Sequence, residues 1–296
     1  MSNAIVPYIK IIRPANVVIT GIAVALGIIL TSGVLPNGVT PVAAAVNPLA
    51  VLALCAAAMA AAAYGNVVND LSDVKSDRVS HPNRPLASGA MTPRAAAVFA
   101  AALAASSMAC ALAASAFHFA ATLAPLALLT LYSNYFKRTR VVGNIIVASL
   151  VAYALLYGSL PRPETKILIL PAILAFLLNF CREIVKDVQD AEGDRRAGWT
   201  TSADLPAAAI KALLISAATV YAALLFMPSL LFRHFGIAYT IVCLTFVVPI
   251  HIYWMVLIIR PNINNHTKRI GAALKLEMVF GLLALAIDKA VMYFIK

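Results

Sequence analysis

The stretch of sequence that decides the fold runs from Val51 to Asp77, VLALCAAAMAAAAYGNVVNDLSDVKSD. Its first part is apolar and uncharged, and at about 1.5 Å per residue a run of this kind crosses much of a lipid bilayer as a helix. Its second part places Asn66, Asp70, Asp73 and Asp77 at steps of 4, 3 and 4 residues. Because a helix turns by about 100° per residue, this spacing keeps the four side chains on one helical face. We therefore expect a membrane helix that ends in an acidic face.

The same arrangement recurs later in the chain, in the stretch REIVKDVQDAEGD that begins at Arg182. Here Glu183, Asp187, Asp190 and Asp194 repeat the steps of 4, 3 and 4, each 117 residues after its counterpart in the first stretch. The match indicates an internal repeat. Since like charges on one helical face repel each other, the two acidic faces together predict a site for a cation.

The composition of the whole chain is that of a membrane protein. Of its 296 residues, 62% are hydrophobic and 12% are charged, and the mean hydropathy is +0.89. These values exclude a soluble domain and a disordered chain. Apolar runs long enough to span a bilayer lie near residues 15–34, 43–68, 94–115, 117–135, 143–160, 167–186, 207–226, 235–259 and 271–294. We expect an all-α, polytopic membrane protein with about nine transmembrane helices, eight or ten being the adjacent alternatives, in a single domain over residues 1–296.

The charges predict the orientation of the chain. The net charge of +11 comes from 23 basic and 12 acidic residues, and because the basic residues flank apolar spans, it indicates topology and no nucleic-acid partner. With the N-terminus inside, 18 Lys and Arg lie in inside segments and 5 in outside ones. Basic residues gather on the cytoplasmic side of membranes. We therefore expect a multi-pass protein of the cell membrane, with the N-terminus and the segments 69–93, 136–142 and 187–206 in the cytoplasm.

Magnesium is the cation that two facing acidic helices favour. Mg²⁺ takes oxygen ligands and is usually held by one or two carboxylates together with substrate phosphates, so the pattern suits a Mg²⁺-bridged diphosphate. The predicted metal ligands are Asp70, Asp73, Asp77, Asp187, Asp190 and Asp194. The predicted catalytic residues are the first two aspartates of each repeat, Asp70, Asp73, Asp187 and Asp190.

Basic and polar residues near the acidic faces complement an anionic substrate. Arginine binds phosphate oxygens in a fork, and lysine acts as a point charge. The predicted substrate-binding residues are Asn66, Arg13, Arg78, Arg84, Lys137, Arg138, Arg182, Lys186 and Tyr132. Arg13, at the inside end of the first span, is the candidate for meeting the headgroup of a lipid acceptor. His81 lies in a polar segment rich in turn residues, and we interpret it as solvated and outside the chemistry.

Three motifs, NVVNDLSDVKSD, HPNRPLASG and REIVKDVQDAEGD, together resemble the signatures of the UbiA superfamily of intramembrane prenyltransferases. The resemblance runs from Arg13 and Pro14 to Lys275 and Gly281 in the last span. It implies nine transmembrane helices around a central cavity, with both aspartate motifs at the cytoplasmic mouth. It also implies that Mg²⁺ and an isoprenyl diphosphate donor bind there and that a lipophilic acceptor enters from the bilayer.

The second motif is most similar to that of archaeal-type enzymes that add a second geranylgeranyl chain to geranylgeranylglyceryl phosphate in ether-lipid synthesis. Chlorophyll synthases carry a related Glu-Gly-Asp pattern, and the segment TTSADLP at 200–206 is longer than the archaeal pattern. An aromatic or chlorin acceptor, as in quinone or chlorophyll synthesis, therefore stays open. Loss of diphosphate leaves an allylic carbocation, which the faces of Tyr64, Tyr132 or Tyr135 are candidates to stabilise.

Other classes of membrane protein fit the sequence less well. A transporter would place its charges near the middle of the membrane rather than in two interfacial faces. A phosphatidyl-type alcohol transferase would carry the order D-x2-D-G-x2-A-R, which the sequence lacks. A purely structural membrane protein leaves the repeated acidic faces without a cause.

Overall fold

Helices form all of the regular structure in the part of the chain described by a computed structural model, residues 5–32, 47–232 and 234–294. The long helices are α2 (Pro14–Thr31), α3 (Pro48–Ser80), α4 (Pro93–Ala114), α5 (Ala116–Asn134), α6 (Val142–Tyr157), α7 (Ile169–Arg196), α8 (Ala207–Leu224), α11 (Val248–Ile259) and α12 (Thr267–Phe294). The short ones are α1 (Val6–Ile11), α9 (Met227–Leu230) and α10 (Ile237–Val242). A π-helical turn, Cys243–Val247, joins α10 to α11 into one continuous span.

The prediction of about nine membrane helices is confirmed. Eight helical segments of the described chain are long and apolar enough to cross a membrane, and α6, with 16 residues, is a shorter apolar helix of the same kind. The predicted end of the first span, at residues 33–34, and the predicted start of the second span, at residues 43–46, lie outside the described residues. The other predicted spans each coincide with an observed helix to within a few residues, except where α3 and α7 continue well past the apolar run.

Proline and capping residues set several helix starts. Pro14, Pro48 and Pro93 each occupy the first position of a helix, where the missing amide proton has no helical partner to lose. The side chain of Asn47 accepts from the amide of Leu49 at 3.0 Å. Such caps satisfy backbone donors that the helix itself leaves unpaired.

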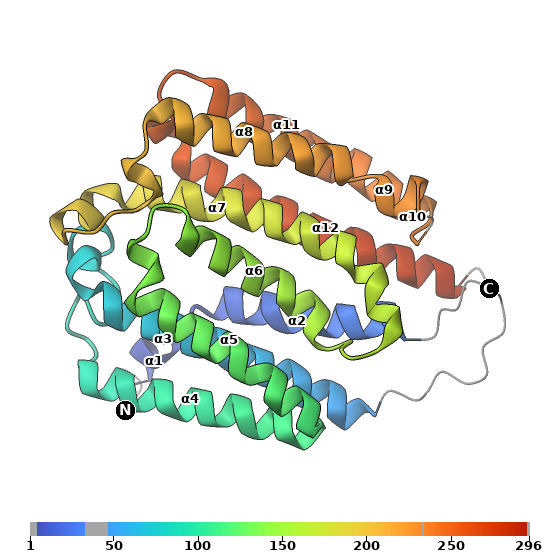
Figure 1. Ribbon diagram of the computed structural model, residues 1–296, viewed down its shortest axis with the longest axis horizontal. Helices are drawn as coiled ribbons and strands as arrows, with labels where there is room; N and C mark the ends of the chain where they lie inside the picture. Colours follow the sequence, from blue (N-terminus) through green and yellow to red (C-terminus); the bar gives the residue numbers. More distant parts are fainter. Residues whose placement is uncertain (1–4, 33–46, 233, 295–296) are drawn as a thin grey trace.

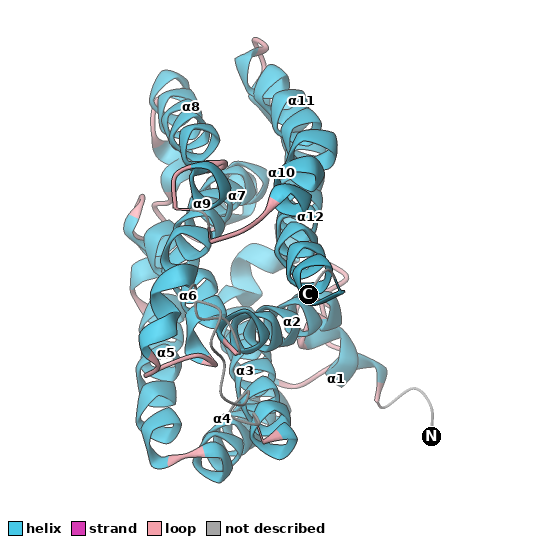
Figure 2. Ribbon diagram, turned by 90° about the vertical axis from the view of Figure 1, so that its right-hand side faces the viewer, coloured by secondary structure: helices cyan, strands magenta, loops and turns pink. Residues whose placement is uncertain are grey.

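The long helices run side by side as a bundle (Figure 1). In the end-on view, α2, α6, α7 and α12 surround the middle of the molecule, α4 and α5 lie toward one end of the section, and α8 and α11 lie toward the other (Figure 2). The cytoplasmic side predicted from the charges corresponds to the left of Figure 1, where α3 and α7 end and α2 and α12 begin.

The two helices that carry the acidic faces extend beyond the apolar thickness of a bilayer. At about 1.5 Å per residue, the 33 residues of α3 and the 28 residues of α7 are about 50 and 42 Å long, against about 30 Å of hydrocarbon. Their last turns carry the two acidic faces. Both predicted acidic segments are therefore continuous extensions of membrane helices rather than separate loops.

Gly193 lets the ends of α3 and α7 approach each other. A Cβ atom at this position would lie 2.6 Å from the carbonyl oxygen of Ser76, closer than any carbon can approach. Only glycine permits this contact without moving a backbone. The close approach brings the two acidic faces to the same place.

A buried polar cluster attaches α12 to α11. Glu277 accepts hydrogen bonds from Trp254 and lies 2.9 Å, between Oε1 and Nδ1, from His251. Glu277 and Trp254 have no exposed surface, so the cluster joins the two helices in a dry environment. It holds the wall of α12 that carries Lys275 and Met278, two residues lining the central cavity.

Candidate active site

Side chains join the two acidic faces directly. Ser76 of α3 donates to Asp194 of α7 at 2.7 Å, and Nε2 of His81, just after α3, lies 2.8 Å from Oδ1 of Asp190. The two repeats, 117 residues apart in sequence, thus form one site, as predicted. The interpretation of His81 as a solvated residue is wrong, because the histidine contacts a predicted metal ligand.

Each aspartate of the first repeat is paired with a basic side chain. Arg13 bonds Asp70, Lys137 bonds Asp73, and Arg84 bonds Asp77 at 2.6 Å. These carboxylates are only 2 to 4% exposed. Because a buried charge without a partner is costly, the cations are necessary where no metal compensates the acids. Three of the predicted substrate-binding residues therefore lie where an anion bound to the aspartates through a metal ion would meet them.

Arg84 lies in the segment between α3 and α4 and reaches back over the acidic face. Its Nη1 is 3.6 Å from Asp70 as well as 2.6 Å from Asp77. Burial alone would lower the pKa of this guanidinium, but the bond to Asp77 and the charge of Asp70 outweigh it and raise the pKa. Arg84 therefore remains a permanent cation at the site.

The second repeat is held mainly by neutral donors. Oδ2 of Asp187 accepts from Asn144 of α6 at 2.9 Å and from the hydroxyl of Ser202 at 2.6 Å. Ser202 belongs to the segment 200–206, in which the amide of Thr201 donates to the carboxylate of Asp204 at 2.9 Å and so orders the turn. The segment 200–206 thus orients Asp187, a predicted catalytic residue.

The donor set fits a magnesium ion shared with a diphosphate. Oδ1 of Asp73 is buried without a hydrogen-bond partner, as expected for a ligand atom. Among the described residues, no three His, Cys, Asp or Glu side chains converge closely enough to hold a metal by themselves. Carboxylates on two helices, completed by phosphate oxygens and water, are the usual environment of Mg²⁺. The role of the six aspartates as ligands remains a prediction.

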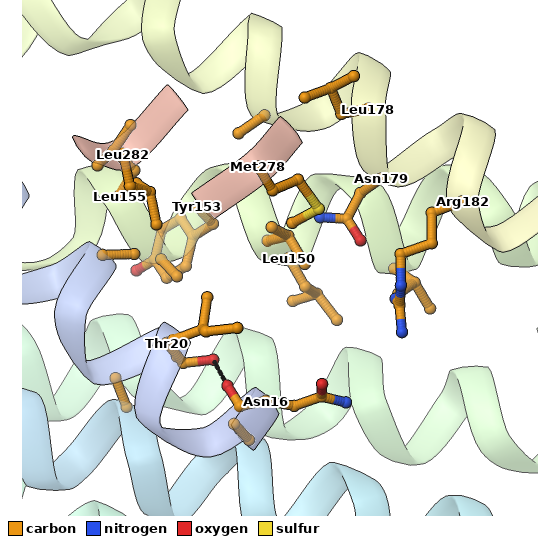
Figure 3. Close-up of a pocket in the computed structure, with 18 of the residues that line it drawn as sticks. Asn16, Thr20, Leu150, Tyr153, Leu155, Leu178, Asn179, Arg182, Met278 and Leu282 are labelled. Carbon is orange, nitrogen blue, oxygen red and sulfur yellow. Dashed lines mark hydrogen bonds between the residues drawn. The ribbon is translucent and has the colours of Figure 1, made fainter. Parts of the chain in front are cut away.

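A cavity of about 320 Å³ extends from the acidic site into the bundle. Its lining on α7 runs from Lys186 to Pro171, about 22 Å along the helix axis. In the close-up, Arg182 lies at one end, whereas Tyr153 and Leu282 lie at the other (Figure 3). The walls between them are mostly aliphatic. The cavity thus has a charged mouth and a long apolar interior.

The structure brings most of the predicted substrate-binding residues to this mouth. Those that line the cavity are Arg13, Asn66, Tyr132, Arg182 and Lys186. Arg182 and Lys186 share Glu183, at 2.8 and 3.5 Å. Asn66 donates to the carbonyl oxygen of Ile12 at 2.7 Å and so supports the chain just before Arg13.

Two predicted substrate-binding residues do not reach the site. Arg78 is exposed and does not line this cavity. Arg138 is also exposed and stacks on the ring of Trp199, with Cζ 4.9 Å from the ring centroid. Its neighbour Lys137, in the same 3-10 turn Phe136–Arg138, lies with Nζ 5.6 Å from the centroid of that ring and also bonds Asp73.

Of the three tyrosines named as candidates to stabilise a carbocation, one lines the cavity. Tyr132 is buried and lines the cavity. Tyr135 is 67% exposed and points away. Tyr64 bonds Thr130 through its hydroxyl at 2.6 Å and does not line the cavity. Tyr132 is therefore the only one of the three that can face a carbocation there.

Sequence reasoning missed several polar residues of the site. Asn69 donates to Asp73 at 2.6 Å, and helical spacing could have shown it, since it lies four residues before that aspartate. Asn144 and Ser202 could not be found in this way, because each comes from another element and contacts Asp187 only through the fold.

Comparison with known proteins agrees with this architecture. Residues 22–271 match the model of the UbiA prenyltransferase family. Digeranylgeranylglyceryl phosphate synthase of Thermococcus kodakarensis is 30% identical over 96% of this chain and 98% of its own length. The synthase of the same name from Methanopyrus kandleri is 33% identical over 73% of this chain and 74% of its own.

Solved structures share the fold over nearly the whole chain. One, of a digeranylgeranylglyceryl phosphate synthase in membranes, superposes with a TM-score of 0.73 at 25% identity and covers 98% of this chain and 99% of that one. Another is a UbiA homologue from Archaeoglobus fulgidus bound to GPP and Mg²⁺, with a TM-score of 0.59 at 20% identity, covering 95% of this chain and 99% of that one. At that identity the second likeness concerns the fold alone.

Proposed function

This chain belongs to the UbiA prenyltransferase family, and on that premise we propose that it transfers a geranylgeranyl group from its diphosphate to geranylgeranylglyceryl phosphate. The observation that carries the proposal is the meeting of two acidic helix ends at the charged mouth of a long apolar cavity. An isoprenyl diphosphate has this same division between an anionic head and an apolar tail.

The aspartates and their cations are arranged for an exchange of partners. Mg²⁺, when bound, would neutralise the diphosphate and make it a better leaving group. Asp70, Asp73 and Asp187 would hold the metal in place of their present partners. Arg13 and Lys137, released from their carboxylates, would bind the phosphate oxygens, on which negative charge increases as the bond to the prenyl carbon breaks.

The cavity would protect the carbocation that remains. Tyr132 presents a buried aromatic side chain at the mouth, and aromatic faces attract cations. The aliphatic walls would hold the isoprenoid tail and keep water from reacting with the carbocation. Attack by the acceptor hydroxyl would form the ether bond and release one proton.

The acceptor is proposed from the relatives. The two archaeal relatives are named as digeranylgeranylglyceryl phosphate synthases, and one of them aligns over almost the entire chain. An acceptor with a phosphate also suits the excess of positive charge at the mouth. There, two basic side chains, Arg182 and Lys186, pair with a single carboxylate, Glu183.

A turnover experiment tests the proposal. Purified protein in nanodiscs would receive labelled geranylgeranyl diphosphate, Mg²⁺ and one of three acceptors: geranylgeranylglyceryl phosphate, an aromatic acid or a chlorin. We expect a prenylated product only with the first, and none when EDTA replaces Mg²⁺. Product with an aromatic or chlorin acceptor alone would contradict the proposed acceptor. Diphosphate release without any prenylated acceptor would contradict the transfer.

A further inference from the structure

A second cavity lies beside the first, between the inside ends of α2, α7 and α12, with a volume of about 370 Å³. No described carboxylate lines it, but six basic side chains do: Arg13, Arg84, Arg182, Lys186, Lys268 and Lys275. We call it the cationic pocket. A cavity with this lining selects for an anion.

The cationic pocket and the acidic site use different faces of α7. Arg182, Val185, Lys186 and Gln189 line the pocket. At about 100° per residue, their face is rotated by about 120° from the face of Glu183, Asp187, Asp190 and Asp194. The pocket is therefore a separate place beside the aspartates, not part of the metal site.

Two of the six basic side chains form no ion pair in the described part of the chain. Arg13 and Arg84 bond the aspartates of α3, and Arg182 and Lys186 bond Glu183. Lys268 and Lys275, seven residues apart on one face of α12, form no ion pair with any described carboxylate. Arg182, Arg13 and Lys186 act on Lys275 as like charges, and the one carboxylate that attracts it, Glu183, already pairs with Arg182 and Lys186. An anion bound between α7 and α12 would relieve this repulsion.

The cationic pocket is continuous with the apolar cavity. Arg13, Asn16, Arg182, Lys186 and Lys275 line both. A lipid can therefore place an anionic head in the pocket while its chain enters the cavity. A diphosphate bridged by metal needs carboxylates, whereas a single phosphate can be bound directly by Lys and Arg.

We propose that the cationic pocket binds the phosphate of the acceptor, a phosphomonoester carried by an isoprenoid glycerol ether, with Lys268 and Lys275 as its unshared ligands. This assignment rests on the proposed function. It places the acceptor phosphate beside the donor diphosphate without sharing its metal, so that the glycerol hydroxyl can approach the first carbon of the donor.

Binding without metal separates the two phosphate sites. Affinity would be measured in EDTA for geranylgeranylglyceryl phosphate, for geranylgeranylglycerol without phosphate, and for geranylgeranyl diphosphate. We expect the wild type to bind geranylgeranylglyceryl phosphate about tenfold or more tightly than geranylgeranylglycerol. The double variant Lys268→Gln/Lys275→Gln should lose that preference, and in turnover its KM for the acceptor should rise several times more than its KM for the donor.

Neighbouring variants control for charge and folding. Arg269→Gln removes the same charge one residue from Lys268, at an exposed position that lines neither cavity, and should keep wild-type KM values. Lys268→Arg/Lys275→Arg should retain the preference for phosphate.

The outcomes distinguish this inference from the proposed function. If the wild type does not prenylate geranylgeranylglyceryl phosphate, the proposed function fails and the assignment fails with it. If the wild type does so and the double glutamine variant keeps its KM for the acceptor, the assignment alone is overturned. An equal rise in both KM values would also overturn it, because the pocket would then serve the donor.

Discussion

Nε2 of His81 lies 2.8 Å from Oδ1 of Asp190, so a residue that follows α3 orients an aspartate in the acidic face of α7. Loss of this contact should disturb the second repeat without removing a carboxylate. We expect His81→Ala to lower kcat by about tenfold, as loss of an outer contact to a metal ligand typically does. His81→Gln, which keeps a donor, should retain more activity.

The control for this prediction is the dependence of rate on Mg²⁺. If His81 acts by positioning Asp190, the alanine variant should need more Mg²⁺ for half-maximal rate, and excess Mg²⁺ should restore part of the activity. A variant with wild-type kcat and Mg²⁺ dependence would show that the contact has no part in the reaction.

Replacing a predicted metal ligand should have a larger effect. Asp70→Asn and Asp187→Asn keep the side-chain volume but remove the charge, and each should lower kcat by about 100-fold or more. Glu192→Gln is the matched control on α7, since its side chain is 64% exposed and pairs only with Arg196; it should keep full activity. Full activity in both aspartate variants would contradict a site formed by the two repeats.

Much of this site could be predicted because helical periodicity places residues on faces. The steps of 4, 3 and 4 located both acidic faces, and the extended helices bear this out. The same rule could have excluded Arg78, which directly follows Asp77 and so lies about 100° around α3 from the acidic face. The position of Arg78 away from the site was therefore predictable from the sequence.

Contacts between distant elements could not be predicted in that way. Lys137 meets Asp73 although 64 residues separate them, and neither helical spacing nor composition indicates this pair. The adjacent Arg138 has the same charge and, like Lys137, lies over the ring of Trp199, but it forms no ion pair with a described carboxylate. Which of the two neighbouring cations reaches the site depends on one short 3-10 turn, Phe136–Arg138, which packs against α5 and α6.

The approach of α3 to α7 at Gly193 should be sensitive to one methyl group. In Gly193→Ala, the new Cβ would contact Ser76 and Ser80, and crowding of this kind costs about 1 to 3 kcal/mol. We expect a lower unfolding temperature and a smaller increase of the reaction rate with Mg²⁺. Gly281→Ala is the stability control, because a Cβ there meets no atom within 4 Å. An equal stability of both variants and the wild type would contradict the close approach.

The orientation in the membrane is open to chemical labelling. A single cysteine replacing the exposed Arg140, in a background without the four native cysteines, should react with an impermeant maleimide only from the cytoplasmic side. Lys166→Cys, at the opposite end of α6 and equally exposed, should react only from the other side. The reverse pattern would overturn the orientation predicted from the charges.

Arg13 lies at the junction of the donor and acceptor sites. It bonds Asp70 of the first repeat and also lines the cationic pocket. Arg13→Gln should therefore raise the KM for both substrates, by about tenfold each, because a hydrogen bond to a charged group contributes about 1.5 to 3 kcal/mol. The Lys268→Gln/Lys275→Gln variant should affect mainly the acceptor. Steady-state kinetics with each substrate varied in turn gives the two ratios. If Arg13→Gln changed only the KM for the acceptor, its contact with Asp70 would have no part in donor binding, and the exchange of partners proposed for the aspartates would be wrong at this residue.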